Sequence, residues 1–226
     1  MTELTLSQAL LLVLWGTLVA VDLVSVPQGM ISRPLIAGTI AGWIAGDVEA
    51  GVRVGVLFEL FALDVLPIGA VRYPDFGPAT VAASALAAGA PWEMELGVSA
   101  ALGLLLALAG GWSLQLVRRT NAKAIQHHAA ALAAGEGPAI RRLQYGSLLR
   151  DAARGAALTA IGLAAGSLVA TVLRLDRATA LGLTLVAIGS ALSAAVNGAI
   201  RSAGHDARLR WLIGGAVAGA ILAVLL

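Results

Sequence analysis

The chain has 226 residues, of which 59% are hydrophobic and only 12% charged, with a formal net charge of +2 and a mean hydropathy of +0.88. Soluble domains carry about 25% charged residues, so this chain has too little polar surface to cover a water-soluble globule. The composition therefore indicates an integral membrane protein. Because cysteine is absent, disulfides, thiolate metal sites and cysteine nucleophiles are excluded.

Apolar runs of different lengths follow one another along the chain. A helix needs about 20 residues to cross roughly 30 Å of hydrocarbon, so the shorter runs are typical of re-entrant helices. We expect an all-α polytopic membrane protein with full-length and short or re-entrant helices, forming one domain over residues 1–226. The predicted segments are 4–26, 34–46, 51–71, 77–90, 96–117, 155–173, 179–200 and 211–226.

Small residues and prolines shape the short segments. Gly38, Gly42 and Gly46 recur every four residues, a spacing that lets a helix approach its neighbour closely. Residues 73–78 contain two prolines, which fix the backbone and remove hydrogen-bond donors, so this stretch predicts a turn.

Residues 118–154 form the main hydrophilic stretch and carry seven of the fifteen cations. By the positive-inside rule we expect a basic cytoplasmic loop, divided into two helices at 135–138. The same rule places the 201–210 turn on the cytoplasmic side and the acidic link at 93–95 on the opposite side.

Glu59 is a carboxylate inside an apolar run, where burial near the bilayer centre costs about 2.5–3.5 kcal/mol. On a helical wheel it shares a face with Gly51 and Gly55, where another helix can come close, so the carboxylate is expected to point into protein. The bulkier residues are expected to face lipid or a larger groove; they are Val54, Leu57, Phe61 and Ile68.

Two interpretations of Glu59 remain open. It accepts hydrogen bonds from a polar solute, or it is a structural carboxylate that is paired with Arg33 or Arg53 or held neutral. Asp64 lies about 140° away on the wheel and is expected to be an interfacial carboxylate at a helix end.

Other polar residues have similar alternatives. Asp22, Gln28 and Arg33 flank the first break and either reach a central cavity or act as capping or interfacial groups. Asn197 is expected to bond between helices. The adjacent pair 127–128 lacks the spacing of a metal-binding histidine pair and indicates a solvated helix. With no phosphate-binding glycine loop, nucleophile elbow or HExxH motif, neither a metal nor a cofactor is expected.

Several motifs occur in a characteristic order. RPLIAGTIAGWIAGD begins at Arg33, G-x-x-x-E-L-x-A-L surrounds Glu59, and P-I-G-A precedes Pro74-Asp75; VRRTNAKAIQHHAA and SLLRDAARGAA follow more weakly. Through these motifs, roughly residues 1–160 resemble the IIC membrane subunit of mannose/fructose/sorbose-type permeases of the phosphotransferase system (PTS).

The resemblance implies a hexose-conducting IIC subunit in the bacterial cytoplasmic (inner) membrane. Its implied membrane partner is a IID subunit, in a trimer of IIC–IID pairs. An elevator-like movement would carry the sugar towards the cytoplasm, where IIB, charged by IIA and ultimately by HPr, would phosphorylate it. Glu59 would be the sugar-binding carboxylate. The predicted substrate-binding residues are Glu59, Gln28, Asp22, Arg33 and Asp75.

Two departures from the family pattern support a second hypothesis. Asp64 and Pro67 stand where family members often have glycine and asparagine, and the chain ends at Leu226, about one membrane segment early. The alternative is a degenerate membrane regulator or scaffold that recruits PTS phosphocarriers without transport. It would be sensitive at Arg141, Arg142 or Arg150 and tolerant at Glu59. A stand-alone membrane enzyme is disfavoured because the sequence shows no nucleophile–base or metal constellation.

Overall fold

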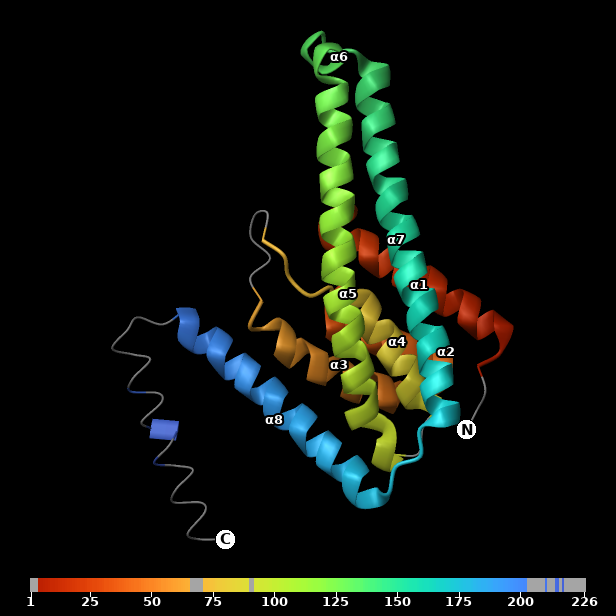
Figure 1. Cartoon of the computed structure of the whole chain (residues 1–226), viewed down its shortest axis with the longest axis vertical. Helices are drawn as coiled ribbons and strands as arrows, with labels where there is room; N and C mark the ends of the chain where they lie inside the picture. The colour runs from red at the N-terminus through yellow and green to blue at the C-terminus, as the bar shows by residue number, and fades with distance from the viewer. Residues whose placement is uncertain are drawn as a thin grey trace.

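The computed structural model describes residues 4–65, 71–89 and 92–202, together with residues 210, 214, 215 and 217. In these residues the regular secondary structure is entirely helical, which confirms the predicted all-α class. The helices are α1 (Leu6–Val24), α2 (Pro34–Ala45), α3 (Val48–Ala62), α4 (Phe76–Gly89), α5 (Trp92–His127), α6 (Ala129–Ala133), α7 (Gly137–Val172) and α8 (Arg177–Ser202) (Figure 1).

Four helices of the described chain are long and apolar enough to cross a membrane, and two more are apolar but shorter. The 12 residues of α2 extend about 18 Å at 1.5 Å per residue, less than the hydrocarbon thickness. Long and short helices therefore coexist, as predicted for a polytopic membrane protein. The long spans are Leu6–Val24, Leu96–His127, Gly137–Val172 and Arg177–Ala199.

Helices α2 and α3 form a tight hairpin through glycine contacts. Gly46 ends α2 at a φ of 97°, which favours glycine, and Asp47 caps α3 by accepting from the Ala50 N–H at 2.9 Å. A Cβ at Gly42 would lie 2.7 Å from the Cα of Gly51. The close approach predicted from the glycine spacing is therefore confirmed.

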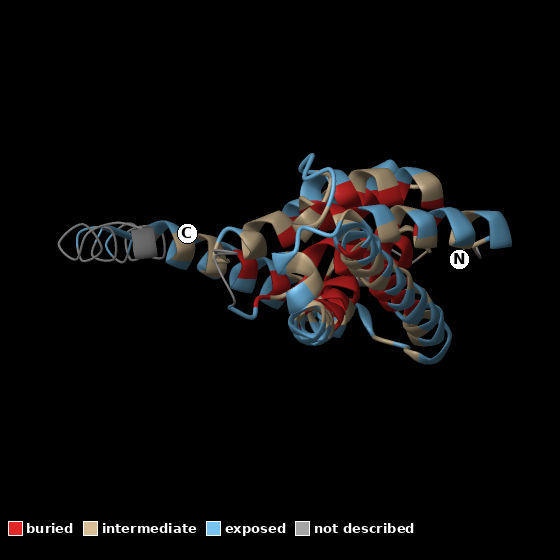
Figure 2. Cartoon of the chain, turned by 90° about the horizontal axis from the view of Figure 1, so that it is seen from above, coloured by how far each residue is buried: buried red, intermediate tan, exposed pale blue. Residues whose placement is uncertain are grey.

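Helix α4 lies at the centre of the bundle and packs against α1, α2, α3, α5 and α7. Every residue from Phe76 to Ala87 is buried, and Figure 2 shows that buried residues gather in the interior of the bundle. The rings of Phe58 and Phe61 from α3 lie 5.9 and 6.5 Å from that of Phe76. Because α4 already begins at Phe76, the turn predicted at 73–78 is shorter than expected.

The face predicted for the bulky residues of α3 was wrong for two of them. Val54 and Leu57 are 0% and 3% exposed, because other helices cover that side of α3. Leu57 clusters with Ala187 and Ala191 of α8. The run predicted at 51–71 was also too long, since α3 ends at Ala62. Residues 66–70, including Ile68, lie outside the described residues, as does most of the predicted segment 211–226.

The hydrophilic stretch 118–154 is largely helical, in agreement with its predicted division into two helices. Helix α5 continues through it to His127 and α7 begins at Gly137, so most of the stretch extends two membrane helices beyond the body of the bundle (Figure 1). Each helix has 36 residues and is about 54 Å long. The division predicted at 135–138 is confirmed, since Gly135 has a φ of 71° and α7 starts two residues later. We call this projection the α5–α7 hairpin.

Candidate functional site

Glu59 of α3 forms an ion pair with Arg33, the residue that caps the N-terminus of α2. Its second carboxylate oxygen accepts a hydrogen bond from the backbone N–H of Leu35 at 3.2 Å. The free N–H groups at a helix N-terminus carry partial positive charge, so both the guanidinium and the helix end stabilise the carboxylate. Of the two cations considered as partners, Arg33 fills this role; Arg53 pairs with Glu49 at 3.0 Å.

The Arg33–Glu59 pair is not sealed inside the protein. The side chain of Arg33 is 43% exposed and that of Glu59 is 20% exposed. A carboxylate has about four acceptor positions and a guanidinium has five N–H donors, so each group keeps capacity after this contact. The pair therefore presents donors and acceptors side by side on an accessible surface.

Asp22 holds the loop that leads from α1 to Arg33. Its side chain is buried, and its two oxygens accept hydrogen bonds from the N–H groups of Gly29 at 2.5 Å and Ser32 at 2.9 Å. Gln28 lies on the same loop, is exposed and has a φ of 58°. Asp22 thus caps neither α1 nor α2, and it fixes the loop backbone before Arg33.

Asp75 belongs to a separate buried network. Its Oδ2 accepts from Arg154 Nη1 at 2.6 Å, and Arg154 Nε donates to Asp151 Oδ1 at 3.0 Å. Ser25, at the end of α1, donates to the other oxygen of Asp151 at 2.9 Å. Asp75, Asp151 and Arg154 are all buried, so this network joins α1, α7 and the segment before α4 inside the protein.

Sequence reasoning missed the roles of Asp151 and Arg154, because both were counted among the charges of a cytoplasmic loop. Their three-residue spacing puts them on the same side of a helix. That side continues into Leu158 and Gly162, which are buried in α7. Continuing the helical period of the following apolar run backwards would have placed these charges on its buried face.

The exposed charge is concentrated on the α5–α7 hairpin. Arg119, Lys123, Arg141 and Arg142 are exposed there. At its base, Arg118 lies 5.1 Å from the ring of Tyr73 and donates to its hydroxyl at 2.8 Å. This contact holds the segment before α4 against α5.

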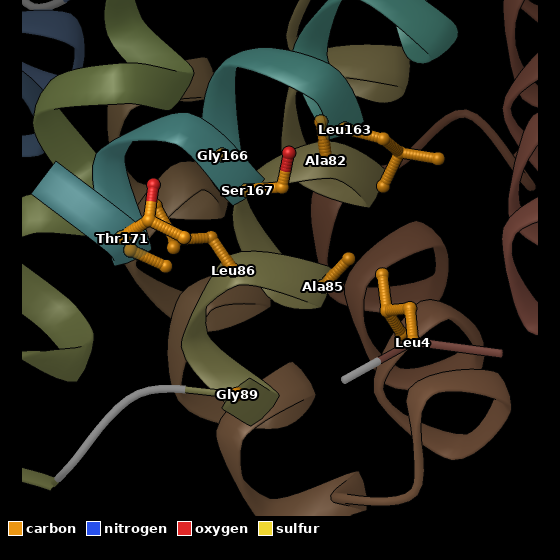
Figure 3. Close-up of a pocket in the computed structure, with 10 residues that line it drawn as sticks. Leu4, Ala82, Ala85, Leu86, Gly89, Leu163, Gly166, Ser167 and Thr171 are labelled. Atoms are coloured by element: carbon orange, nitrogen blue, oxygen red, sulfur yellow. The ribbon is translucent and has the colours of Figure 1, made fainter. Parts of the chain in front are cut away.

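An apolar cavity of about 250 Å³ lies between the N-terminal end of α1, α4 and α7 (Figure 3). Its two hydroxyl groups, from Ser167 and Thr171, donate to carbonyls of their own helix at 2.8 Å. The remaining lining is aliphatic or glycine, including Leu86 and Leu163. The cavity therefore offers few polar contacts for a sugar.

Comparison with known families identifies the chain. Residues 6–201 match the family described as the "PTS system sorbose-specific IIC component". The chain belongs to this family. It is accordingly a multi-pass, sugar-translocating IIC subunit of the PTS, which confirms the resemblance found in the sequence. The match extends beyond residue 160, where the sequence resemblance was expected to end. No curated protein matches this IIC subunit.

Two solved structures share the fold of the IIC subunit. One, described as "Structure of membrane protein", is 25% identical with a TM-score of 0.75; the match covers 99% of this chain and 96% of that one. The other is the mannose transporter ManYZ in complex with microcin E492 (MceA). It is 22% identical with a TM-score of 0.58 and the same coverage of 99% and 96%, and it supports the fold alone.

The five residues predicted to bind substrate thus occupy three places in the IIC subunit. Arg33 and Glu59 contact each other, Asp22 at the end of α1 binds the loop that carries Gln28, and Asp75 lies in the buried network. Elsewhere, Asn197 of α8 donates to Asp64, two residues after the end of α3, at 2.9 Å, so it bonds to another segment but not directly to a second helix.

Proposed function

We propose that the Arg33–Glu59 pair is the sugar-binding centre of this IIC subunit. The observation that carries the proposal is an ion pair between α2 and α3 that remains open to a ligand, with the side chains of Arg33 and Glu59 43% and 20% exposed. Ionisable residues within membrane segments are costly and commonly mark a substrate pathway. The Arg33–Glu59 pair lies at the tightly packed α2–α3 hairpin, which holds it rigidly.

The chemistry of the pair suits a hexose. Each sugar hydroxyl both donates and accepts, so adjacent hydroxyls can donate to Glu59 and accept from Arg33. Gln28 lies on the preceding loop and offers an amide with both capacities. We assign Asp22 and Asp75 a positioning role, because their carboxylates already bind the loop backbone and Arg154.

The proposed assembly follows from the family and from the charge pattern. We propose that the chain acts with a IID subunit, as a trimer of IIC–IID pairs, in the bacterial inner membrane. The cations of the α5–α7 hairpin favour its placement in the cytoplasm. There, IIB, charged by IIA, would phosphorylate the emerging sugar, so the IIC chain is a transporter subunit and not an enzyme by itself.

Uptake and phosphorylation of labelled hexoses test this proposal. Cells would express the IIC chain with its neighbouring IID and IIAB proteins and receive a panel of labelled sugars. Glu59→Gln should abolish uptake of the sugar that the wild type transports. Glu49→Gln is the matched control, because Glu49 lies on the same helix and pairs with Arg53 instead. Normal uptake by Glu59→Gln would contradict a sugar-binding role.

The exposed cations of the α5–α7 hairpin also support the second candidate, a regulator that recruits phosphocarriers without transport. This reading predicts no sugar uptake by the assembled wild-type complex. It also predicts binding of a phosphocarrier that is lost when Arg141 and Arg142 are replaced. Arg150 is less informative, since its Nε donates to Asn121 at 2.8 Å and its replacement would disturb the hairpin itself.

A further inference from the structure

A second, polar cavity lies at the base of the α5–α7 hairpin, beside the end of α1. Its volume is about 310 Å³. In contrast to the apolar cavity near α4, this cavity is lined mostly by polar side chains. The polar lining consists of Ser25, Arg118, Asn121, Ser147 and Asp151.

Hydrogen bonds fix these side chains in place. Asn121 of α5 donates to Ser147 of α7 at 2.7 Å and accepts from Arg150 at 2.8 Å. Ser25 donates to Asp151 at 2.9 Å, and Asp151 is held from behind by the buried Arg154. The site is therefore organised before any ligand arrives, which reduces the ordering cost of binding.

The lining keeps donors and acceptors for a ligand. The hydroxyl proton of Ser147 is not used by its bond from Asn121, and Asp151 has further acceptor positions. Arg118 has N–H groups beyond those bound to Tyr73 and Val71. A ligand that presents several hydroxyl groups, each both donor and acceptor, would match this set.

The charges around the cavity favour a neutral ligand. Two cations, Arg118 and Arg154, balance two carboxylates, Asp75 and Asp151, in and behind its wall. Arg150, whose Nε donates to Asn121, does not line the cavity. An anionic group placed within the cavity would meet the carboxylate of Asp151, which lines it directly.

We propose that this cavity is a second binding site for a neutral polyhydroxylated ligand, the transported sugar, on the side of the protein that carries the basic hairpin. The proposal rests on the sugar-translocating function proposed above. Ser25 in the cavity and Arg33 in the first site are joined by one short loop, which Asp22 holds. That loop connects the two sites directly along the chain.

Equilibrium dialysis of the purified IIC–IID complex tests the proposal, with labelled mannose and labelled mannose 6-phosphate as probes. Ser147→Leu would fill the cavity, whereas Thr120→Leu adds the same side chain at an exposed position of α5 outside it. Ser147→Ala removes only the hydroxyl and guards against misfolding of the larger variant. Unfolding temperatures would be measured for all three.

We expect Ser147→Leu to abolish a mannose-binding component that Thr120→Leu and Glu59→Gln both retain. Ser147→Ala should weaken that component about fivefold, the effect of one hydrogen bond. The second site would be overturned if Glu59→Gln lost all mannose binding. It would also be overturned if the folded Ser147→Leu or Ser147→Ala variant bound mannose as the wild type does. Loss of mannose 6-phosphate binding alone would overturn the assignment to a neutral sugar. Failure of the Arg33–Glu59 site would appear separately, as unchanged mannose binding in Glu59→Gln.

Discussion

Arg154 and Asp75 form an ion pair at 2.6 Å although 79 positions separate them in the sequence. Their side chains are 5% and 0% exposed, and Arg154 also binds Asp151 at 3.0 Å. The guanidinium of Arg154 thus connects α7 to the segment just before α4. Removal of either partner would leave the other charge buried without compensation, which is costly.

Replacement of Arg154 should therefore destabilise the protein strongly. Arg154→Leu leaves Asp75 and Asp151 buried without their cation, and breaking a buried pair in this way costs about 3–5 kcal/mol. The unfolding temperature in detergent would report the loss. Arg141→Leu is the control, because Arg141 is exposed on the same helix. Equal unfolding temperatures for the two variants would contradict the importance of the network.

The glycine contact between α2 and α3 should tolerate no added methyl group. A Cβ at Gly42 would lie 2.5 Å from the backbone oxygen of Asp47, and backbone atoms cannot move aside as a flexible side chain can. Gly42→Ala should cost about 1–3 kcal/mol by overpacking. Gly189→Ala on α8 meets nothing within 4 Å and should be neutral or slightly stabilising in the same unfolding measurement. A stable Gly42→Ala variant would refute the close packing.

Arg33→Lys should impair sugar uptake while keeping the positive charge. Lysine cannot reproduce the planar fork of donors that a guanidinium offers to a carboxylate and a ligand. Hydrogen bonds to charged groups contribute about 1.5–3 kcal/mol, so we expect the KM for uptake to rise roughly tenfold or more. Arg53→Lys, beside Glu49 on α3, should leave KM unchanged. A normal KM in Arg33→Lys would argue against direct sugar contact by Arg33.

Reversal of charge on the hairpin should slow phosphorylation of the sugar. In the double variant Arg141→Glu, Arg142→Glu, an acidic phosphocarrier would be repelled, and the defect should shrink as added salt screens the charges. Phosphorylation rates at several phosphocarrier concentrations and ionic strengths would show this. Arg174→Glu, an exposed position at the opposite end of α7, serves as the control. An equal loss of phosphorylation rate in the double variant and in Arg174→Glu would contradict docking at the hairpin.

The sequence predicted the fold class because the length of an apolar run and the spacing of its glycines depend only on residues close together in the chain. The ends of α1 and α2 fall within two residues of the predicted segments, and Gly42 makes the close helix contact that the spacing predicted, although the spacing did not name Gly51 as its partner. The sequence also predicted two helices within the charged stretch 118–154, but not that they continue the membrane helices α5 and α7 without a break. Solvated helices carry such charge equally well.

Part of the site could not be predicted from local pattern. A helical wheel separates the faces of α3 but does not reveal that α8 covers Leu57, since that contact joins segments far apart in the chain. The same reason conceals the partner of Asp75. The wheel did identify the face on which Glu59 meets α2, because close packing there depends on the glycines of α3 itself.

The unbroken course of α5 and α7 has a mechanical consequence. Over a length of about 54 Å, a tilt of roughly 5° displaces the far end of a rigid helix by about 5 Å, close to one helical turn. Near the membrane body, Gly110 of α5 packs against Asp75, while α7 carries Arg154. A partner that tilts the tip of the α5–α7 hairpin therefore also acts on the two helices that contact the buried Asp75–Arg154 pair.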